Sequence, residues 1–192
     1  MNTTLKIIKK RSSVYLIAWL AAVALALVLA VASPNESRVM GQLPVLLSKT
    51  LTQQPLSLPE GLPSDRTLAL ITFSAEQRAQ AESWIEGLNL KNDTSIAWVR
   101  MPVVNDPGTH SGRSEVENRL LQRYPAITER AKLMPIFTNR DDFVRSASLN
   151  GVAQSYAVVV NRKGDVLARV EGKFDAEKAQ ILRETLRTGN PQ

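Results

Sequence analysis

The sequence contains no cysteine, and this absence removes a whole set of chemistries. A chain without thiols can form no disulfide bond, no thiolate metal site and no cysteine nucleophile. It also contains a single histidine, His110, which excludes a metal site built from several histidines. We therefore expect no metal centre and no cofactor.

The chain also lacks a strong excess of positive charge beyond its N-terminal region. The formal net charge is +6, but the first eleven residues alone supply four basic side chains, Lys6, Lys9, Lys10 and Arg11. From residue 12 onward, 20 basic residues face 18 acidic ones. Because a phosphate backbone requires a concentrated basic surface, we expect no nucleic-acid partner.

Charged residues are absent from the segment 14–32, which reads VYLIAWLAAVALALVLAVA. As a helix this segment would be roughly 28 Å long, close to the hydrocarbon thickness of a bilayer. The basic residues before it favour a cytoplasmic N-terminus. The sequence therefore predicts a cytoplasmic tail over 1–13, a transmembrane signal-anchor over 14–32 in a bacterial inner membrane, and a periplasmic remainder.

An alternative for the same segment is a cleaved secretory signal. Ala30-Val31-Ala32 before Ser33 has the small-residue pattern of a cleavage site, with basic and apolar regions in the expected order. The apolar region of a secretory signal usually spans about 7 to 15 residues, and this one is longer. The length favours an uncleaved anchor, while release into the periplasm after Ala32 stays open.

Residues 33–66 are rich in proline and predict a linker. The segment holds five of the ten prolines in the chain, Pro34, Pro44, Pro55, Pro59 and Pro63. Proline lacks an amide donor and disfavours helix in its predecessor, so a largely non-helical spacer is expected. The apolar stretch 43–51 within it is able to pack on the following domain as a strand or short helix.

From Thr67 the sequence alternates between strand and helix patterns. The apolar run 67–73 predicts a buried strand, and Ser74 with Gln77 forms a capping box for the helix that follows. Residues 95–101 predict a second strand. Ser114 with Glu117 suggests another capping box and a second helix, after a polar loop that includes residues 105–112. We expect three large aromatic side chains of these elements to fill the interior, Trp84, Trp98 and Tyr124.

The C-terminal half continues the alternation. Residues 134–138 predict a short strand and 140–151 a short helix, with Asp141 and Asp142 at its N-terminal cap and an Asn150-Gly151 stop. Residues 155–172 predict two strands around a turn at Gly164. Asp175 is expected to cap a final helix. Crossovers through helices imply parallel strands and the tight turn implies an antiparallel pair, so 67–192 predicts one α/β domain with a mixed sheet and helices on both faces.

The stretch NGVAQSYAVVVNRKGDVLARVEG, residues 150–172, resembles the thioredoxin-like superfamily, particularly its membrane-tethered and peroxiredoxin-like extracytoplasmic members. The matching residues are Gly151, Val152, Asn161, Gly164 and Gly172. The spacing is also similar to that of the small cysteine-less periplasmic proteins of the YtfJ type. The resemblance covers about residues 67–187 and implies a thioredoxin-like fold.

The departures from that family bear on function. Active members carry a Cys-x-x-Cys pair at the first helix start, and counting from Phe73 places those positions at Arg78 and Ala81. The proline that usually precedes the later strand in the cis form corresponds to Ser155. The resemblance therefore implies the fold without its thiol chemistry, and we expect no redox activity.

Three groups of polar residues are candidate sites, and each also has an ordinary surface role. Arg78 in the first turn of a helix is a candidate for binding an anion or a carboxylate, although most such residues are simply solvated. The loop 105–115, with Arg113, has glycines and hydroxyls that suit a phosphate but lacks any known phosphate-loop spacing. Asp106 and His110 with Glu76 or Glu115 make a weak metal or acid-base candidate.

The leading hypothesis is a membrane-anchored extracytoplasmic binding or assembly module with a protein partner. In the thioredoxin-like arrangement Arg78 and Ser155 should lie on the face where active relatives bind extended chains, so both are binding candidates together with Arg113. No catalytic residue is predicted. Two alternatives remain, a thiol-independent enzyme that uses the loop 105–115 and a structural subunit of an envelope complex. A Ser-His-Asp triad has its residue types but no nucleophile-elbow motif.

Overall fold

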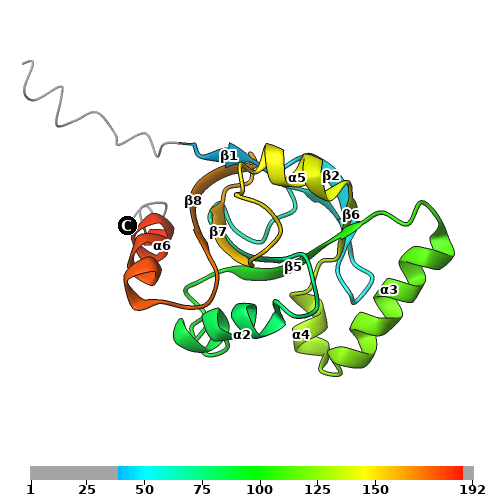
Figure 1. The fold of residues 1–192 in the computed structure, drawn as a ribbon. Coiled ribbons are helices and arrows are strands. Elements are labelled where there is room, and N and C mark those ends of the chain that lie inside the picture. Colours follow the sequence, from blue (N-terminus) through cyan, green and yellow to red (C-terminus); the bar gives the residue numbers. More distant parts are fainter. Residues whose placement is uncertain (1–38, 188–192) are drawn as a thin grey trace, which may run out of the picture. The chain divides into compact units, whose positions relative to one another are not determined.

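The computed structural model describes residues 39–187 (Figure 1). The predicted tail 1–13, the predicted membrane segment 14–32 and the first part of the predicted linker lie outside the described residues. Among the helices of residues 39–187, none combines the length and the apolar character that crossing a bilayer requires.

A six-stranded mixed sheet forms the centre of the fold. Its order is β1 (Gly41–Gln42), β8 (Asp165–Glu171), β7 (Tyr156–Val160), β4 (Thr67–Thr72), β5 (Trp98–Asn105) and β6 (Ile136–Thr138). The neighbours β4, β5 and β6 are parallel, whereas β4–β7, β7–β8 and β8–β1 are antiparallel. The predicted mixed sheet is thereby confirmed.

Five helices accompany the sheet in the described part of the chain. They are α2 (Arg78–Gly87), α3 (His110–Arg123), α4 (Ile127–Ala131), α5 (Arg140–Ser146) and α6 (Ala176–Arg187). Figure 1 shows α2 and α6 on one side of the strands and α5 on the other. The short α4 was not predicted, because five residues between a proline and a strand give too little periodicity.

The two faces of β4 separate two apolar cores. Leu68 and Leu70 pack with Trp84 of α2 and Leu182 of α6. Ala69 and Ile71, which alternate with them, belong to the cluster that contains Phe143 of α5. Successive side chains of a strand point to opposite faces, so this alternation requires a covering layer on each side. The prediction of helices on both faces is confirmed.

The segment 39–66, predicted as a linker, packs into the domain. It contributes β1, which extends the central sheet, and the antiparallel pair β2 (Leu46–Lys49) and β3 (Pro55–Leu58). Four of its leucines are buried, Leu43, Leu51, Leu58 and Leu62. The prediction that the stretch 43–51 packs on the domain is confirmed, but the domain boundary at 66/67 is wrong. The reason is that apolar side chains between the prolines pack into the core of the domain, so the segment folds as part of it.

Helix α2 begins later than the capping box predicted. The N-cap is Gln77, and its side chain makes no capping hydrogen bond. Instead, the Phe73 amide donates to Gln77 Oε1 at 2.8 Å, and Gln77 Nε2 donates to the Val152 carbonyl at 2.7 Å. Gln77 is buried, and through these two hydrogen bonds its side chain connects the end of β4 with the loop before β7.

Helix α3 begins earlier than predicted. Its N-cap is Thr109, whose hydroxyl accepts a hydrogen bond from the Gly112 amide at 3.2 Å. Part of the predicted loop 105–112 is therefore the first turn of the helix. Glu117, predicted as a capping residue, is buried within the helix and pairs with Lys49 Nζ of β2 at 2.9 Å.

The caps of the C-terminal half follow the sequence signals with two shifts. The Asp175 carboxylate accepts hydrogen bonds from two amides of α6, as predicted. The N-cap of α5 is Asn139, so Asp141 and Asp142 lie in the first turn rather than at the cap. That helix ends at Ser146, before the predicted stop, with Ser148 in the left-handed region at φ 52°.

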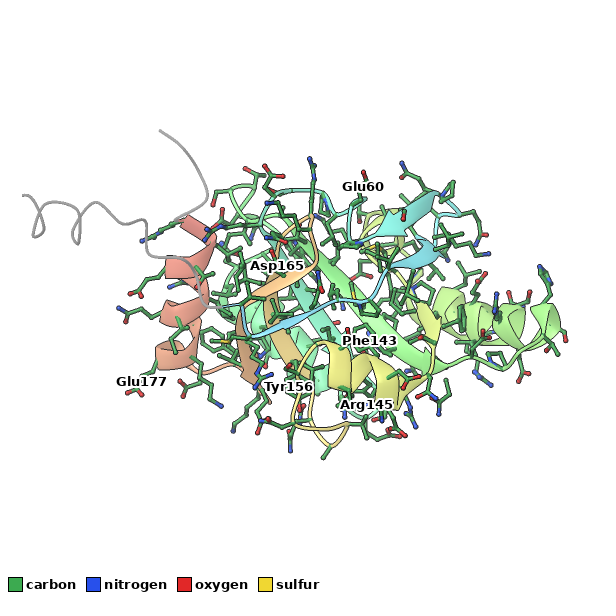
Figure 2. The ribbon with its side chains drawn as sticks, turned by 90° about the horizontal axis from the view of Figure 1, so that it is seen from above. Glu60, Phe143, Arg145, Tyr156, Asp165 and Glu177 are labelled. Atoms are coloured by element: carbon green, nitrogen blue, oxygen red, sulfur yellow. The ribbon has the colours of Figure 1, made fainter. Side chains whose placement is uncertain are left out.

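The β7–β8 turn has the predicted form. Asn161 Oδ1 accepts hydrogen bonds from the Lys163 and Asp165 amides, both at 2.9 Å. Gly164 has φ +93°, a conformation that favours glycine. Figure 2 shows Asp165, which follows this turn, and Tyr156 at the start of β7.

Candidate functional site

The junction between β4 and α2 opens onto a cavity of about 300 Å³. Strands β4 and β5 form one side of this cavity, and α2 and α3 supply the others. Its lining residues are Leu70, Thr72, Phe73, Ser74, Ala75, Arg78, Ala81, Arg100, Pro102, Val104, Val116, Arg119, Leu120, Arg123, Tyr124 and Leu133. We call this space the α2–α3 cavity. Arg78 and Ala81, the positions to which the sequence resemblance assigns the thiols, both border it.

The charged side chains that line the α2–α3 cavity are all arginines. Arg78, Arg119 and Arg123 are exposed at its mouth, whereas the Arg100 side chain is only 4% exposed and lies at its floor. Among residues 39–187, no carboxylate lines the cavity. The remaining lining is mainly apolar, so the cavity combines a basic mouth with apolar walls.

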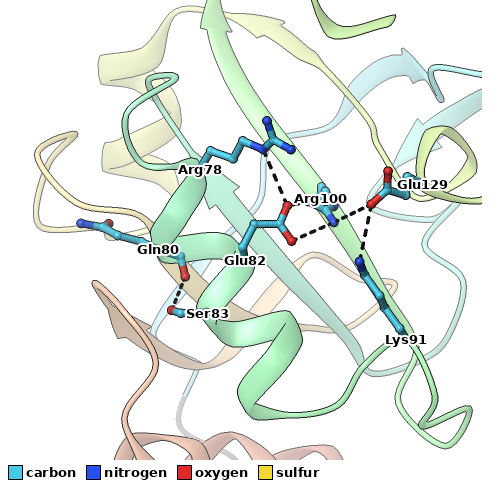
Figure 3. A network of polar contacts seen from close by, with 7 residues as sticks. All are labelled: Arg78, Gln80, Glu82, Ser83, Lys91, Arg100 and Glu129. Carbon is cyan, nitrogen blue, oxygen red and sulfur yellow. Dashed lines mark hydrogen bonds and ion pairs between the residues drawn. The ribbon is translucent and has the colours of Figure 1, made fainter. Parts of the chain in front are cut away.

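Arg100 is the centre of a polar network behind the cavity (Figure 3). Its guanidinium binds Glu82 of α2 through both terminal nitrogens, and Nη2 lies 3.6 Å from Glu129 Oε1 of α4. Glu82 also approaches Arg78, and Glu129 approaches Lys91, at 3.8 Å each. The network therefore connects α2, β5 and α4 through one buried cation.

Aromatic rings complete the surroundings of Arg100. The guanidinium carbon lies 5.1 Å from the centre of the Tyr124 ring and 5.7 Å from the Trp98 ring. Arg78 approaches the same Tyr124 ring at 5.0 Å. Cations are attracted to the faces of aromatic rings, and this attraction grows when water is excluded. Tyr124 thus helps to hold one arginine at the mouth and one at the floor.

The Nε of Arg100 is buried and has no hydrogen-bond partner within the described residues. A buried donor left unpaired costs about 1 to 3 kcal/mol, and more when the group is charged. Such groups are uncommon in native proteins and invite a functional explanation. Here the donor belongs to Arg100, a side chain that lines the cavity, while the Nε atom itself is shielded from solvent.

Ser155 lies outside the α2–α3 cavity. It is buried, its amide donates to Gln80 Oε1 at 2.8 Å, and its carbonyl accepts from the Gly172 amide at 2.8 Å. Gln80 of α2 also donates to Gln154 at 2.7 Å. The loop before β7 is therefore fixed to α2 through Gln80, while Arg78 points to Tyr124. The structure does not bring Arg78 and Ser155 into contact.

Arg113 lies in a different place, near the start of α3. Its Nε donates to Asp106 Oδ1 at 2.8 Å, and its guanidinium lies 5.9 Å from the centre of the Phe137 ring. The hydrogen bonds from Arg113 hold the pKa of Asp106 below its usual value. Arg113 lines a second cavity of about 350 Å³ together with Lys49, His110 and Glu117.

The carboxylates near His110 are not arranged as a metal site or a triad. Within residues 39–187, no three potential metal-ligating side chains of the histidine, cysteine, aspartate or glutamate type lie together. His110 is exposed, with Nδ1 3.4 Å from Ser114 Oγ. The Asp106 carboxylate is held by Arg113, which leaves the histidine without the third member of a triad.

Sequence reasoning missed Arg100, Arg119 and Arg123. Arg119 and Arg123 recur one turn apart on α3, a spacing that puts two side chains on one helix face. Arg100 had a clearer signal, because it is the only charged residue in an otherwise apolar predicted strand. An ionised side chain in a buried strand requires a partner of opposite charge. Arg100 pairs in register with Leu70 of β4, on the face of the sheet that α2 covers.

Comparisons with known proteins identify the fold. No family model matches the chain, and no curated protein sequence matches it. Among solved structures, BsSco, a member of the Sco family of cytochrome c oxidase assembly proteins, is similar at 15% identity with a TM-score of 0.53. The similarity covers 78% of this chain and 95% of BsSco.

Two proteins of Aquifex aeolicus VF5 are similar to the same extent. One, to which electron transport is ascribed, has 13% identity and a TM-score of 0.55 over 78% of this chain and 99% of its own. The other, to which electron transfer is ascribed, has 12% identity and a TM-score of 0.54 over 77% and 97%. At these identities the similarity concerns the fold alone. The fold is thioredoxin-like, as predicted, in a chain without cysteine.

Proposed function

We propose that this thioredoxin-like, cysteine-free domain is a binding module that serves assembly in the cell envelope, without thiol redox activity. One observation carries the proposal. At the helix start where the resemblance puts the reactive thiols, Arg78 and Ala81 instead border a cavity with an arginine mouth and, within the part of the chain that the structure describes, no carboxylate. The site offers electrostatic attraction and apolar surface, but it offers no sulfur nucleophile.

The helix start supports binding of a negatively charged group. The N-terminal end of a helix carries a partial positive charge, which favours anions. In α2 the Arg78 and Gln80 amides already donate to the Ala75 and Gln77 carbonyls, so this charge acts there without free amides. The first turn of α2 contains no acidic residue and has Arg78 as its first residue. Positive potential therefore comes from both the backbone and the side chain, and a partner with an exposed carboxylate is favoured there.

Placement in the envelope rests on the sequence. Residues 14–32 are uncharged and long enough to span a bilayer, and four basic residues precede them. We propose a single-pass inner-membrane protein with its folded domain in the periplasm, or a periplasmic protein if the chain is cleaved after Ala32. An assembly role draws support from the similarity to BsSco, a member of an assembly-protein family.

A thiol-independent enzyme is a second candidate, and the second cavity favours it. That cavity brings together Lys49, His110, Arg113 and Glu117, which are able to transfer protons or bind charged groups. The nearest ion pair, Lys49 with Glu117 at 2.9 Å, satisfies both groups with each other. Ser114 lies beside His110 in this cavity, but Arg113 holds the Asp106 carboxylate that would orient the histidine, so binding at the α2–α3 cavity is the better supported function.

Partner capture tests the proposal. The full chain should be purified from crosslinked, solubilised membranes beside Arg78→Ala and the control Arg145→Ala, which removes an exposed arginine of α5. Loss of a charge-assisted hydrogen bond weakens binding by about tenfold to a hundredfold. We expect that loss for Arg78→Ala and none for Arg145→Ala, with thermal stability unchanged in both.

Two results would reject the proposal. One is recovery of the same partner at the same yield from the wild type and from Arg78→Ala; contact through residues 14–66, as in a structural subunit, would then explain capture. The other is disulfide reductase, isomerase or thiol-peroxidase turnover that follows the purified protein and disappears in Arg78→Ala.

A further inference from the structure

We infer that the α2–α3 cavity binds a carboxylate that is carried on an apolar body. This assignment rests on the proposed binding function and names the chemistry of the group that the cavity accepts. Three features of the described residues carry it: arginines with spare donors at the mouth, the buried cation Arg100 at the floor, and apolar walls between them.

The arginines at the mouth have donors to spare. The closest carboxylate oxygen to Arg78 Nε, that of Glu82, is 3.8 Å away, beyond hydrogen-bond distance. Arg123 forms no ion pair among the described residues, and its charge acts at longer range on Glu76. Arg119 binds Glu115 through one nitrogen at 3.0 Å. Because each guanidinium carries five N–H donors, all three retain donors for a ligand.

The floor carries a further positive charge, that of Arg100. This side chain lines the cavity and is only 4% exposed, while its terminal nitrogens are engaged by Glu82 on the side of α2. Its charge is independent of the helix start, since Arg100 belongs to β5.

The walls select the rest of the ligand. Leu70, Pro102, Val104, Leu120 and Leu133 all line the cavity. A strongly hydrated ion such as phosphate gains nothing from these side chains and loses its water on entry. A carboxylate with a short hydrocarbon part gains from both the arginines and the walls. A volume of about 300 Å³ is at the small end of ligand pockets, which suits a short chain or a single side chain.

The test uses the full-length chain in neutral detergent and three probes of defined chemistry. Hexanoate carries the carboxylate and an apolar chain, hexanamide has the same shape without the charge, and inorganic phosphate has the charge without the chain. Binding is measured by calorimetry and by saturation-transfer NMR. Variants are Arg78→Gln, Arg123→Gln and Val116→Trp, which places an indole in the cavity from α3; Arg145→Gln is the control.

We expect saturable binding of hexanoate, at least tenfold weaker binding of hexanamide, and no competition by phosphate at equal concentration. Arg78→Gln and Arg123→Gln should each weaken hexanoate binding by about tenfold or more, with no effect of Arg145→Gln. Val116→Trp should abolish binding. Circular dichroism melting checks that each variant is folded, and the two glutamine variants decide the outcome if Val116→Trp does not fold.

The inference is overturned if hexanoate does not bind, if hexanamide binds equally well, if phosphate displaces hexanoate, or if the glutamine variants bind like the control. These failures are separable from failure of the proposed function. Partner capture that depends on Arg78, in a protein that ignores hexanoate, would retain the binding module and reject this ligand class. Selective hexanoate binding with capture independent of Arg78 would retain the ligand class and reject the protein-partner function at this site.

Discussion

At the scale of single residues, Arg100 places a full charge inside a small domain. Its guanidinium satisfies Glu82 and approaches Glu129, and these carboxylates belong to two helices. Attraction in a poorly solvated setting is strong, but it must offset the loss of water around every charged partner. The arrangement therefore fixes the positions of α2 and α4 relative to β5. Its net contribution to stability is smaller than the number of contacts suggests.

Substitution Arg100→Met should destabilise the protein by about 3 kcal/mol, because it leaves the Glu82 and Glu129 carboxylates near apolar surface without their closest cation. The lower end of the range for buried pairs is expected, since the side chains of Glu82 and Glu129 are 25% and 28% exposed. Urea unfolding measures the change. Arg145→Met, which breaks a surface pair, should cost under about 1 kcal/mol. Equal effects of the two substitutions would contradict the structural role of Arg100.

Tyr156 gives the protein a sensitivity to alkaline pH. Burial raises the pKa of its phenol above the ordinary value, and the negative charge of Glu171 raises it further. The folded state thus favours the neutral phenol, and the unfolded chain ionises first. The stability that this group contributes is present below about pH 10 and is lost as the pH rises through the folded-state pKa.

We therefore expect the wild type to lose stability more steeply than Tyr156→Phe above about pH 10. Urea midpoints measured from pH 8 to 12 test this slope, and phenolate absorbance reports the ionisation directly. Parallel curves for the two proteins would show that Tyr156 titrates normally.

At the scale of elements, the β2–β3 hairpin offers a matched pair of leucines. Leu58 is 1% exposed and belongs to the core cluster with Ile71 and Phe143, whereas Leu47 is 91% exposed. Leu58→Ala should lower the free energy of unfolding by about 2 to 5 kcal/mol, through lost burial and a cavity. Leu47→Ala should change it by less than about 0.5 kcal/mol. Similar losses at both positions, measured by urea unfolding, would show that the hairpin does not pack as described.

The start of α2 shows that tertiary contacts can override a capping pattern in the local sequence. Ser74 and Gln77 have the spacing of a capping box, yet Gln77 instead binds the Phe73 amide and the Val152 carbonyl. The two hydrogen bonds of the buried Gln77 side chain stabilise the fold more than one solvent-exposed helix cap would, since such a cap typically contributes about 1 kcal/mol. This shift makes Arg78, rather than a serine or glutamate, the first residue of α2.

At the scale of the whole molecule, the orientation in the membrane stays a prediction. Fusions at the C-terminus should be active with a periplasmic reporter such as alkaline phosphatase and inactive with a reporter that works only in the cytoplasm. The reason is the basic cluster before residues 14–32, which favours a cytoplasmic N-terminus. The opposite pattern would reject the placement. N-terminal sequencing that begins at Ser33 would replace the anchor by a cleaved signal.

By itself, the sequence determined the alternation of strands and helices from Thr67, the mixed sheet, the β7–β8 turn and the absence of thiols. These follow from local properties: the period of apolar residues, the conformational freedom of Gly164, and composition. The resemblance in residues 150–172 supplied the thioredoxin-like fold, and the structure agrees with it.

Only the tertiary structure decided the site and the extent of the domain. The α2–α3 cavity draws Arg78, Arg100 and Arg123 from α2, β5 and α3, and no local pattern encodes their meeting. The structure likewise showed that residues 39–66 belong to the folded unit, because the burial of Leu43 and Leu58 depends on a core formed by distant strands. Contacts between residues far apart in the chain arise from packing. The sequence therefore shows that Arg100 is a charged residue in an apolar strand, but it does not show which residues pair with it.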